Sequence, residues 1–245
     1  MIRVAWLTNK DVKGGQGGAE ASDRDMLRHR PEGVEVTLVR TGGVLDGRLD
    51  NFDYIVAAGL WGFTSRELNA LKAMGFTYWV HDTQLAGHWI YEDATNLIFL
   101  TPGHGEFELS KNPLIQKPKI FYNPGWMDTS KCFSAAKQEY ALWASRPDPN
   151  KGLDLATKWA ADKGIELKVL TSVTRDQVLG AMAEAKYFVL MPHLYDAGPR
   201  SIMEAQLCGC EIVVNENVGM WDEPWNDLQA RITRAPEEFW NVVLG

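Results

Sequence analysis

Two basic residues stand five positions apart in the segment SRPDPNKG, where Arg146 comes near the start and Lys151 near the end. Arginine offers a planar fork of donors and lysine a point charge, and together they suit the oxygens of a diphosphate. Pro147 and Pro149 stiffen the segment, and Gly152 can open a following helix. The same residues would also fit a solvated surface turn, so the pair alone leaves both interpretations open.

A pair of acids lies in residues 193–210, HLYDAGPRSIMEAQLCGC, directly after an apolar run. Asp196 and Glu204 are eight positions apart, the first in an expected loop and the second on an expected helix. The alternative interpretations are a loop or capping acid for Asp196 and a solvated helix face for Glu204. Because Ile202 and Met203 mark this helix as largely buried, the solvated alternative is the weaker one for Glu204. A carboxylate there can accept hydrogen bonds from two ribose hydroxyls.

The junction between these acids has the residue types of an anion site. Gly198 lets the backbone come close to a phosphate, and Pro199 suits the first turn of a helix. The backbone N–H groups of Arg200 and Ser201 would then point outward at the positive end of the helix. An acid on each side of such a junction indicates a site for a polyhydroxy ligand that carries phosphate.

A glycine-rich segment near the N-terminus, NKDVKGGQGGAEAS, lies between an expected strand and an expected helix. Gly17 and Gly18 would let the backbone approach a ligand at the helix N-terminus. The segment is not a dinucleotide fingerprint, because Glu20 stands where the third glycine would be required. A flexible loop without a ligand is an equal alternative.

One histidine follows an expected strand in the segment YWVHDTQ, where His81 precedes Asp82. A lone histidine is more often structural than catalytic. Ligands of α/β proteins, however, collect at the carboxyl ends of strands, and a histidine there is a candidate for function.

These groups need a scaffold that brings strand ends together, and the chain alternates short β-rich runs with helical segments. Such alternation is typical of α/β architecture with parallel strands. We expect strands at Arg3–Leu7, Val34–Val39, Tyr54–Ala58, Thr77–Val80, Leu97–Leu100, Lys119–Phe121, Tyr140–Trp143, Glu166–Leu170, Tyr187–Met191 and Glu211–Val214. We expect helices at Ala19–His29, Ser65–Met74, Gly105–Ser110, Gly152–Lys163, Arg175–Glu184, Pro199–Leu207 and Pro236–Leu244.

The segment YNPGWMDTSKCF separates two such series and is rich in turn-forming residues. We interpret it as a hinge between two Rossmann-like domains, residues 1–125 and 126–245, whose sheets would face each other across a cleft. The C-terminal helix of the second domain could pack back on the first. Every motif described above then lies just after a strand, where the ligand is expected.

Composition limits the function further. The 245 residues carry a net charge of −7, with 13 basic against 16 acidic residues up to residue 130 and 12 against 16 after it. Neither part is therefore a basic platform for nucleic acid. No run approaches eighteen apolar residues, so no transmembrane segment is expected, and the N-terminal MIRVAWLTNK lacks the apolar core of a signal peptide.

The three cysteines, Cys132, Cys208 and Cys210, are odd in number and do not have the spacing of a zinc site. We interpret them as small buried side chains in a reducing compartment. The sequence therefore predicts a cytoplasmic protein with no metal site and no cofactor.

The ordered set of motifs resembles nucleotide-sugar glycosyltransferases of the GT-B fold, in particular the retaining family 4, in a short form. The residues that carry the likeness are GGAE at 17–20, HD at 81–82, NPGWMD at 123–128, the Arg146–Gly152 segment, and the acids of residues 196–204 with GC and NVG downstream. No single motif is specific, whereas the set in this order is.

The resemblance implies a role for each site residue. Arg146 and Lys151 would hold the donor diphosphate and stabilise the leaving group, and Glu204 would bind the donor ribose. Asp196, where the family usually has Glu, would contact the transferred sugar, and His81 would bond the sugar near the reacting carbon. The remaining donor-binding positions would approach sugar or phosphate through the backbone; they are Gly17, Gly18, Gly198, Arg200 and Ser201.

The predicted reaction moves a sugar from a nucleoside-diphosphate sugar to an acceptor hydroxyl with retention of configuration. With two cations on the leaving group, a divalent metal is not needed. Other activities of the fold, such as an epimerase or a phosphorylase, stay open, as does a non-catalytic module with some of the ten tryptophans as sugar platforms. An NAD-dependent oxidoreductase is disfavoured by the glycine spacing.

The acceptor is not defined by the sequence. A glycan, a lipid-linked sugar and a small molecule all fit the family's range. Modified DNA stays an alternative, but the acidic balance of both parts of the chain argues against it.

Overall fold

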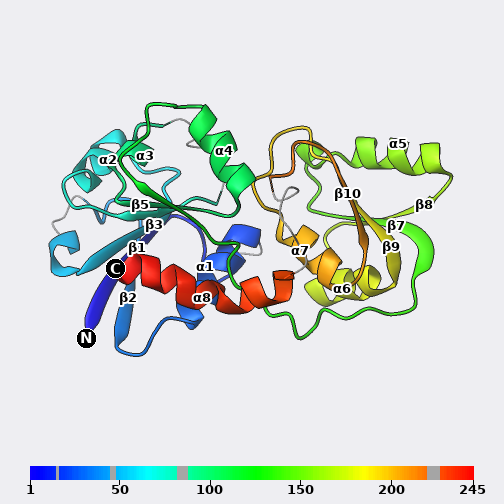
Figure 1. The fold of residues 1–245 in the computed structure, drawn as a ribbon, viewed down its shortest axis with the longest axis horizontal. Coiled ribbons are helices and arrows are strands. Elements are labelled where there is room, and N and C mark those ends of the chain that lie inside the picture. The colour runs from blue at the N-terminus through cyan, green and yellow to red at the C-terminus, as the bar shows by residue number, and fades with distance from the viewer. Residues whose placement is uncertain (15–16, 45–47, 82–87, 220–226) are drawn as a thin grey trace. The chain divides into compact units, whose positions relative to one another are not determined.

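The computed structural model consists of two compact units, and each is described by itself (Figure 1). Unit 1 contains Met1–Met127 and Ala230–Gly245, and unit 2 contains Asp128–Gln229. Each unit has one sheet of parallel strands, so the expected α/β class is confirmed. The structure describes residues 1–14, 17–44, 48–81, 88–219 and 227–245.

Unit 1 holds a six-stranded sheet in the order β2-β1-β3-β4-β5-β6. Its strands are β1 (Ile2–Thr8), β2 (Val34–Val39), β3 (Tyr54–Gly59), β4 (Thr77–Trp79), β5 (Asn96–Phe99) and β6 (Lys119–Tyr122). Its helices are α1 (Gly18–Arg28), α2 (Ser65–Leu71), α3 (Ile90–Asp93), α4 (Pro102–Ser110) and α8 (Leu228–Leu244), with a 3-10 turn, η1, at Arg48–Asn51.

The central strands of this sheet are apolar on both faces because each face is covered. Alternate residues of β1, Val4 and Trp6, belong to one core together with Trp240 of α8 and Met26 of α1. The residues between them belong to a second core with helices α2 to α4. Helix α8 thus follows unit 2 in the chain but packs on the sheet of unit 1.

Unit 2 holds a four-stranded sheet in the order β10-β9-β7-β8. Its strands are β7 (Gln138–Ala144), β8 (Glu166–Leu170), β9 (Ala185–Leu190) and β10 (Glu211–Val214). Its helices are α5 (Leu153–Lys163), α6 (Arg175–Glu184) and α7 (Arg200–Leu207), with a 3-10 turn, η2, at Pro149–Lys151. Helix α5 covers one face of the sheet, and α6 and α7 cover the other (Figure 1).

Several helices begin where short polar side chains cap them. Thr64 and Thr174 accept hydrogen bonds from the backbone N–H of Glu67 and Gln177, and these side chains return the bond, which forms two capping boxes. Thr101 caps α4, and Pro102 occupies its first turn. Helix α4 therefore starts three residues earlier than the sequence predicted.

The C-terminal helix differs most from its prediction. The sequence predicted this helix at Pro236–Leu244, but the helix begins at Leu228 and Pro236 lies inside it. Phe239 and Trp240 are fully buried against the sheet, and the Asn123 amide donates to the Ala235 carbonyl beside the proline, at 2.8 Å. Tertiary packing thus outweighs the local preference of proline.

Among the helices that the structure describes, none is long and apolar enough to cross a membrane. Within the same described residues, no group of three or more His, Cys, Asp or Glu side chains could hold a metal ion.

Candidate functional site

Two of the predicted site residues are in direct contact in unit 2. The Lys151 ammonium, at the end of η2, donates a hydrogen bond to Oδ2 of Asp196, in the loop between β9 and α7. Their side chains are only 21% and 19% exposed, so the contact is partly shielded from water. The sequence placed both residues after strands, and neighbouring parallel strands bring their carboxyl ends to one edge of the sheet.

Backbone packing explains why Lys151 reaches this position. Gly152 has φ of +66° and is the left-handed residue that ends η2 and precedes α5. A Cβ on Gly152 would overlap the Met191 carbonyl oxygen, so the two loops can pass each other only at a glycine. The same approach lets the His193 N–H donate to the Asn150 carbonyl, at 2.9 Å.

Asp196 is held by the backbone of the segment that follows β10. Its N–H donates to the Asn217 carbonyl at 2.7 Å, and its carbonyl accepts from the Gly219 N–H at 2.9 Å. Asp196 and Val218 form a parallel bridge outside the main sheet. A Cβ on Gly219 would lie 2.7 Å from the Ala197 carbonyl oxygen, so a glycine is required for this approach. The carboxylate of Asp196 therefore extends from a fixed backbone.

Arg146 lies in the same loop as Lys151, but its side chain is 73% exposed. Its Nη2 lies 3.3 Å from Oδ2 of Asp148, two residues along the chain. The two cations of the SRPDPNKG segment are therefore each paired with a different carboxylate. An exposed pair of this kind is weak and can open for another anion.

Glu204 is buried on α7, with a residue exposure of 1%, as the sequence indicated. Oε1 of Glu204 forms an ion pair with the Arg175 guanidinium, which is 47% exposed at the start of α6. A buried carboxylate is unfavourable without a counter-charge, and Arg175 supplies it. The sequence analysis missed Arg175, although the Thr174–Gln177 capping pattern places this residue at a helix start.

The helix predicted at Pro199–Leu207 starts one residue later in the structure, so Pro199 precedes the first turn that it was expected to occupy. Helix α7 begins at Arg200, and its N-cap is Pro199, whose side chain makes no capping hydrogen bond. Gly198 precedes this cap, and Ser201 lies in the first turn of the helix. The positive end of the α7 dipole thus lies four residues after Asp196 in the chain.

The glycine-rich segment of unit 1 leads into α1. Gly17 is its N-cap and Gly18 its first residue. A Cβ on Gly17 would overlap the Glu20 carboxylate, so this acid folds back over the helix N-terminus. Any diphosphate that approached the backbone here would have to displace the Glu20 side chain.

His81 is paired with a carboxylate that the sequence analysis did not single out. Its Nε2 lies 2.8 Å from Oδ1 of Asp23 on α1, and the two side chains are 2% and 0% exposed. The Trp79 ring lies against His81 with a centroid distance of 4.1 Å. Asp82, the second residue of that motif, lies outside the described residues. The pair is buried, and His81 is therefore held in one orientation.

A second buried histidine, His104, lies close enough to His81 to be affected by its charge. Burial, with a contribution from the charge of His81, lowers the pKa of His104 to about 3. Nδ1 of His104 accepts from the Leu100 N–H at 3.2 Å, so its proton is on Nε2, which lies 3.8 Å from Oε1 of Glu108. The neutral form is required by the backbone bond, and nothing in the sequence pattern indicated this.

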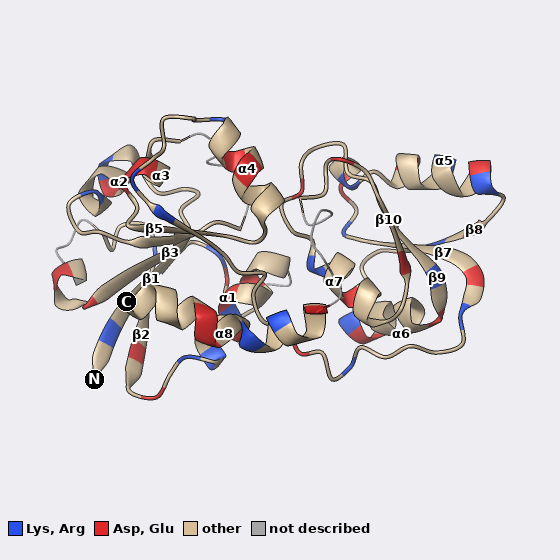
Figure 2. Ribbon diagram, in the orientation of Figure 1, with Lys and Arg blue, Asp and Glu red and all other residues tan. Residues whose placement is uncertain are grey.

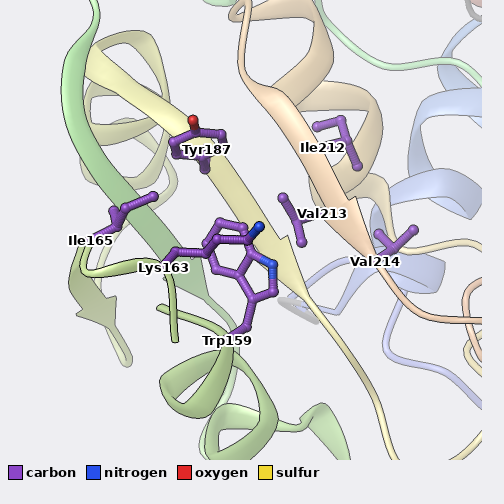
Figure 3. A pocket seen from close by; sticks show the side chains of 7 residues that line it. All are labelled: Trp159, Lys163, Ile165, Tyr187, Ile212, Val213 and Val214. Atoms are coloured by element: carbon purple, nitrogen blue, oxygen red, sulfur yellow. The ribbon is translucent and has the colours of Figure 1, made fainter. Parts of the chain in front are cut away.

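A separate hollow of about 420 Å³ lies on the sheet of unit 2, opposite α6 and α7 (Figure 3). Trp159 and Lys163 contribute to it from α5, Tyr187 from β9 and Val213 from β10. None of the predicted site residues lines this hollow. This hollow is therefore separate from the site that the sequence predicted.

Comparisons with known proteins found no match in sequence. No protein-family model matches the chain. No curated protein matches it either.

Solved structures do match the fold over nearly the whole chain. HepE from Anabaena, in complex with UDP and glucose, is 14% identical, with a TM-score of 0.62 over 100% of this chain and 92% of the other. Sucrose-phosphate synthase from Thermosynechococcus elongatus is 10% identical, with a TM-score of 0.63 over 98% and 90%. An alpha-glucosyltransferase in complex with UDP-glucose and DNA is 13% identical, with a TM-score of 0.53 over 96% and 90%.

These structures are GT-B glycosyltransferases, and the predicted fold is thereby confirmed. At 10–14% identity the likeness concerns the fold. Function has to be argued from the residues of the site.

Proposed function

We propose that the protein is a glycosyltransferase that uses a nucleoside-diphosphate sugar. The observation that carries the proposal is the contact of Lys151 with Asp196 at the carboxyl edge of the unit 2 sheet, just before the N-terminus of α7. In an open α/β sheet this edge is where ligands bind. A cation, a carboxylate and a helix N-terminus there can recognise a phosphate and a sugar hydroxyl together.

The proposed donor exchanges partners with the residues of the free protein. A donor phosphate replaces the Asp196 carboxylate on Lys151, and Asp196 then accepts hydrogen bonds from the hydroxyls of the transferred sugar. Arg146 leaves Asp148 in the same way, because an exposed ion pair contributes little stability. Glu204 accepts hydrogen bonds from the ribose through Oε2, while Arg175 stays on Oε1.

The chemical step is electrostatically assisted transfer. The bond between the anomeric carbon and the diphosphate oxygen breaks, the acceptor oxygen bonds the same carbon, and the acceptor proton passes to the departing diphosphate. Arg146, Lys151 and the α7 N-terminus stabilise the negative charge that develops on that diphosphate. We propose that the acceptor attacks the face that the leaving group vacates, so that configuration is retained.

Two cations supply the charge that a divalent ion supplies in other transferases, so the proposed mechanism uses no metal. EDTA should then leave the rate unchanged. His81 is proposed to contact the sugar, but its burial with Asp23 also fits a structural role. We therefore expect a smaller loss of turnover from His81→Asn than from Lys151→Met.

The neighbouring structures guide the choice of donor. HepE has been solved with UDP-glucose, with UDP, and with UDP and glucose. We therefore place uridine donors first. For the acceptor we propose a glycan, a lipid-linked sugar or a small molecule, because acidic and basic positions are mixed in both units and the net charge is −7 (Figure 2). Modified DNA is the weaker alternative.

The experiment is a thermal-shift screen with nucleoside diphosphates and their sugars. Preferential binding to the folded state raises the unfolding midpoint by mass action. We expect one nucleotide series to raise the midpoint of the wild type, and the Lys151→Met variant to lose most of that rise. A panel in which no nucleotide or nucleotide sugar shifts the wild type would contradict the proposal.

A further inference from the structure

A buried lysine in unit 1 stands at a place where open α/β sheets bind ligands. Lys10 follows β1 by two residues and is only 5% exposed. Its ammonium donates a hydrogen bond to the carbonyl oxygen of Ala58 in β3, at 2.8 Å. It therefore bridges the carboxyl ends of β1 and β3.

These two strands flank the topological switch point of the sheet. The chain runs from β1 outward to β2 on one side and returns to β3 on the other side of β1. Crossover connections diverge between β1 and β3, and ligands of such sheets bind in the crevice outside this point. Lys10 therefore lies where sheets of this topology bind their ligands.

The surroundings fix the side chain of Lys10 in place. A Cβ on Gly59 would lie 3.0 Å from Cε of Lys10 and 2.9 Å from Oγ1 of Thr8, so the lysine stem occupies space that only a glycine leaves. Oγ1 of Thr8 also accepts a hydrogen bond from the Lys10 backbone N–H, at 3.2 Å. The ammonium is therefore held at one point rather than extended into solvent.

The charge of Lys10 is not balanced by its neighbours. No carboxylate in the described part of the chain forms an ion pair with it, and the Ala58 carbonyl satisfies one of its three N–H donors. Burying an ammonium without a counter-charge is strongly unfavourable. A methionine of similar length would fill the same space without this penalty, so a lysine here calls for an anionic ligand.

We propose that Lys10 is the centre of a phosphate-binding site at the switch point of unit 1. This site goes beyond the proposed function, which places the donor diphosphate on Arg146 and Lys151 of unit 2. The phosphate belongs either to the nucleotide or to a phosphorylated acceptor. Both sources offer the same oxygens to the ammonium, and they are separated by the choice of probe.

The test compares pyrophosphate binding, by calorimetry, in three proteins that all carry Lys151→Met and so have a disabled unit 2 site. The first has no other change, the second adds Lys10→Met, and the third adds Lys13→Met as the control. Lys13 is exposed in the same loop, so its removal makes the same change in net charge. We expect Lys10→Met to weaken binding about tenfold or more, as for loss of a charge-assisted hydrogen bond, and Lys13→Met to change it less than about threefold.

The unfolding midpoint of the ligand-free proteins gives a second readout. If the Lys10 ammonium has no counter-charge, replacing it removes an unfavourable buried charge. We therefore expect Lys10→Met to unfold at the same temperature as its parent or at a higher one. Unchanged pyrophosphate affinity would overturn the proposal. A variant that no longer folds, or that unfolds at a clearly lower temperature, would also overturn it, since Lys10 would then be a structural hydrogen-bond donor to the Ala58 carbonyl.

The source of the phosphate follows from two further probes on the same proteins. If the site binds the phosphate of the nucleotide, Lys10→Met weakens the binding of uridine diphosphate and leaves the binding of glucose 6-phosphate unchanged. If it takes a phosphorylated acceptor, the order is reversed. Equal binding of both probes by the variant and its parent would contradict the site. Because unit 2 is disabled throughout, failure here leaves the proposed transferase function untouched.

Discussion

The ammonium of Lys151 donates a hydrogen bond to the carboxylate of Asp196, although the two residues are proposed to hold different parts of one donor. In the free protein the Asp196 carboxylate is thus bound to Lys151, the cation that is proposed to bind the leaving diphosphate. The contact holds the two side chains together in a partly shielded place, where they are 21% and 19% exposed. In the proposed mechanism, binding of the donor would therefore exchange one anion for another on Lys151.

Removing the competing acid should strengthen binding of a nucleotide that lacks the sugar. We expect Asp196→Asn to bind uridine diphosphate severalfold more tightly than the wild type in calorimetry, while turnover with the full donor falls. Asp154→Asn is the matched control, since it makes the same change in net charge at an exposed acid that pairs with His193. Weaker binding of uridine diphosphate by Asp196→Asn would show that Lys151 does not exchange partners.

Gly152 should tolerate a side chain far less well than Gly164, although both have φ of +66°. A Cβ at Gly164 meets nothing within 4 Å, whereas one at Gly152 overlaps the Met191 carbonyl. We expect Gly164→Ala to lower the free energy of unfolding by about 1 kcal/mol, the cost of a left-handed alanine. Gly152→Ala adds a backbone clash and should lower it by about 3 kcal/mol or more. Urea denaturation of both variants checks this, and equal losses would contradict the packing described for the two loops.

The Arg175–Glu204 pair should show the energetics of a buried carboxylate. We expect Arg175→Gln to lower the free energy of unfolding by about 2 kcal/mol, less than for a fully buried pair because the guanidinium is 47% exposed. Adding Glu204→Gln removes the uncompensated charge and should restore most of the loss. Lys131→Gln, in the exposed pair with Asp176, should cost less than about 1 kcal/mol. A double variant no more stable than Arg175→Gln would show that Glu204 is not charged in the folded protein.

Features of the fold and the site that depend on nearby residues in the chain could be predicted from the sequence. Features that depend on contacts between distant segments could not. The central strands were predictable because both of their faces are buried and their inner residues are apolar, as in Val4–Leu7 of β1. The sequence placed Lys151 and Asp196 each after a strand, but it did not predict their contact, because the contact depends on β7 and β9 being neighbours in the sheet. The Arg175 pair was not predictable, because it depends on how α6 packs against α7.

The position of Pro236 inside α8 and the burial of Lys10 could not be predicted either, because both depend on contacts between distant parts of the chain. Pro236 lies inside α8 because Phe239 and Trp240 anchor that helix on the sheet of unit 1, a long-range effect that outweighs the local rule. The burial of Lys10 depends on Gly59, which follows almost fifty residues later. In the sequence Lys10 was one of two lysines in a glycine-rich loop.

His104 should make the protein less stable as the pH falls. Its pKa is about 3 in the folded state, against 6.5 in the unfolded chain, so between these values the unfolded chain binds one more proton. Stability from this group is therefore fully present above pH 6.5 and is lost as the pH falls towards 3, by about 1.4 kcal/mol per pH unit.

His104→Asn should remove this slope, because the asparagine oxygen can replace Nδ1 as the acceptor for the Leu100 N–H. Urea denaturation at several values between pH 6 and pH 4 measures it. We expect the unfolding free energy of the variant to fall less steeply with decreasing pH than that of the wild type, and the difference in slope should correspond to about one bound proton. Parallel curves for the two proteins would mean that His104 is not kept neutral by the fold.

Release of nucleoside diphosphate from the sugar donor that the thermal-shift screen selects is the most direct test of the proposed function. The wild type should release it, by slow hydrolysis or by transfer. Arg146→Ala and Lys151→Met should be about 100-fold slower or more while they unfold at nearly the wild-type temperature. If the wild type bound the donor without releasing any product, or if both variants kept the wild-type rate, the assignment of these two cations to the leaving group would be wrong.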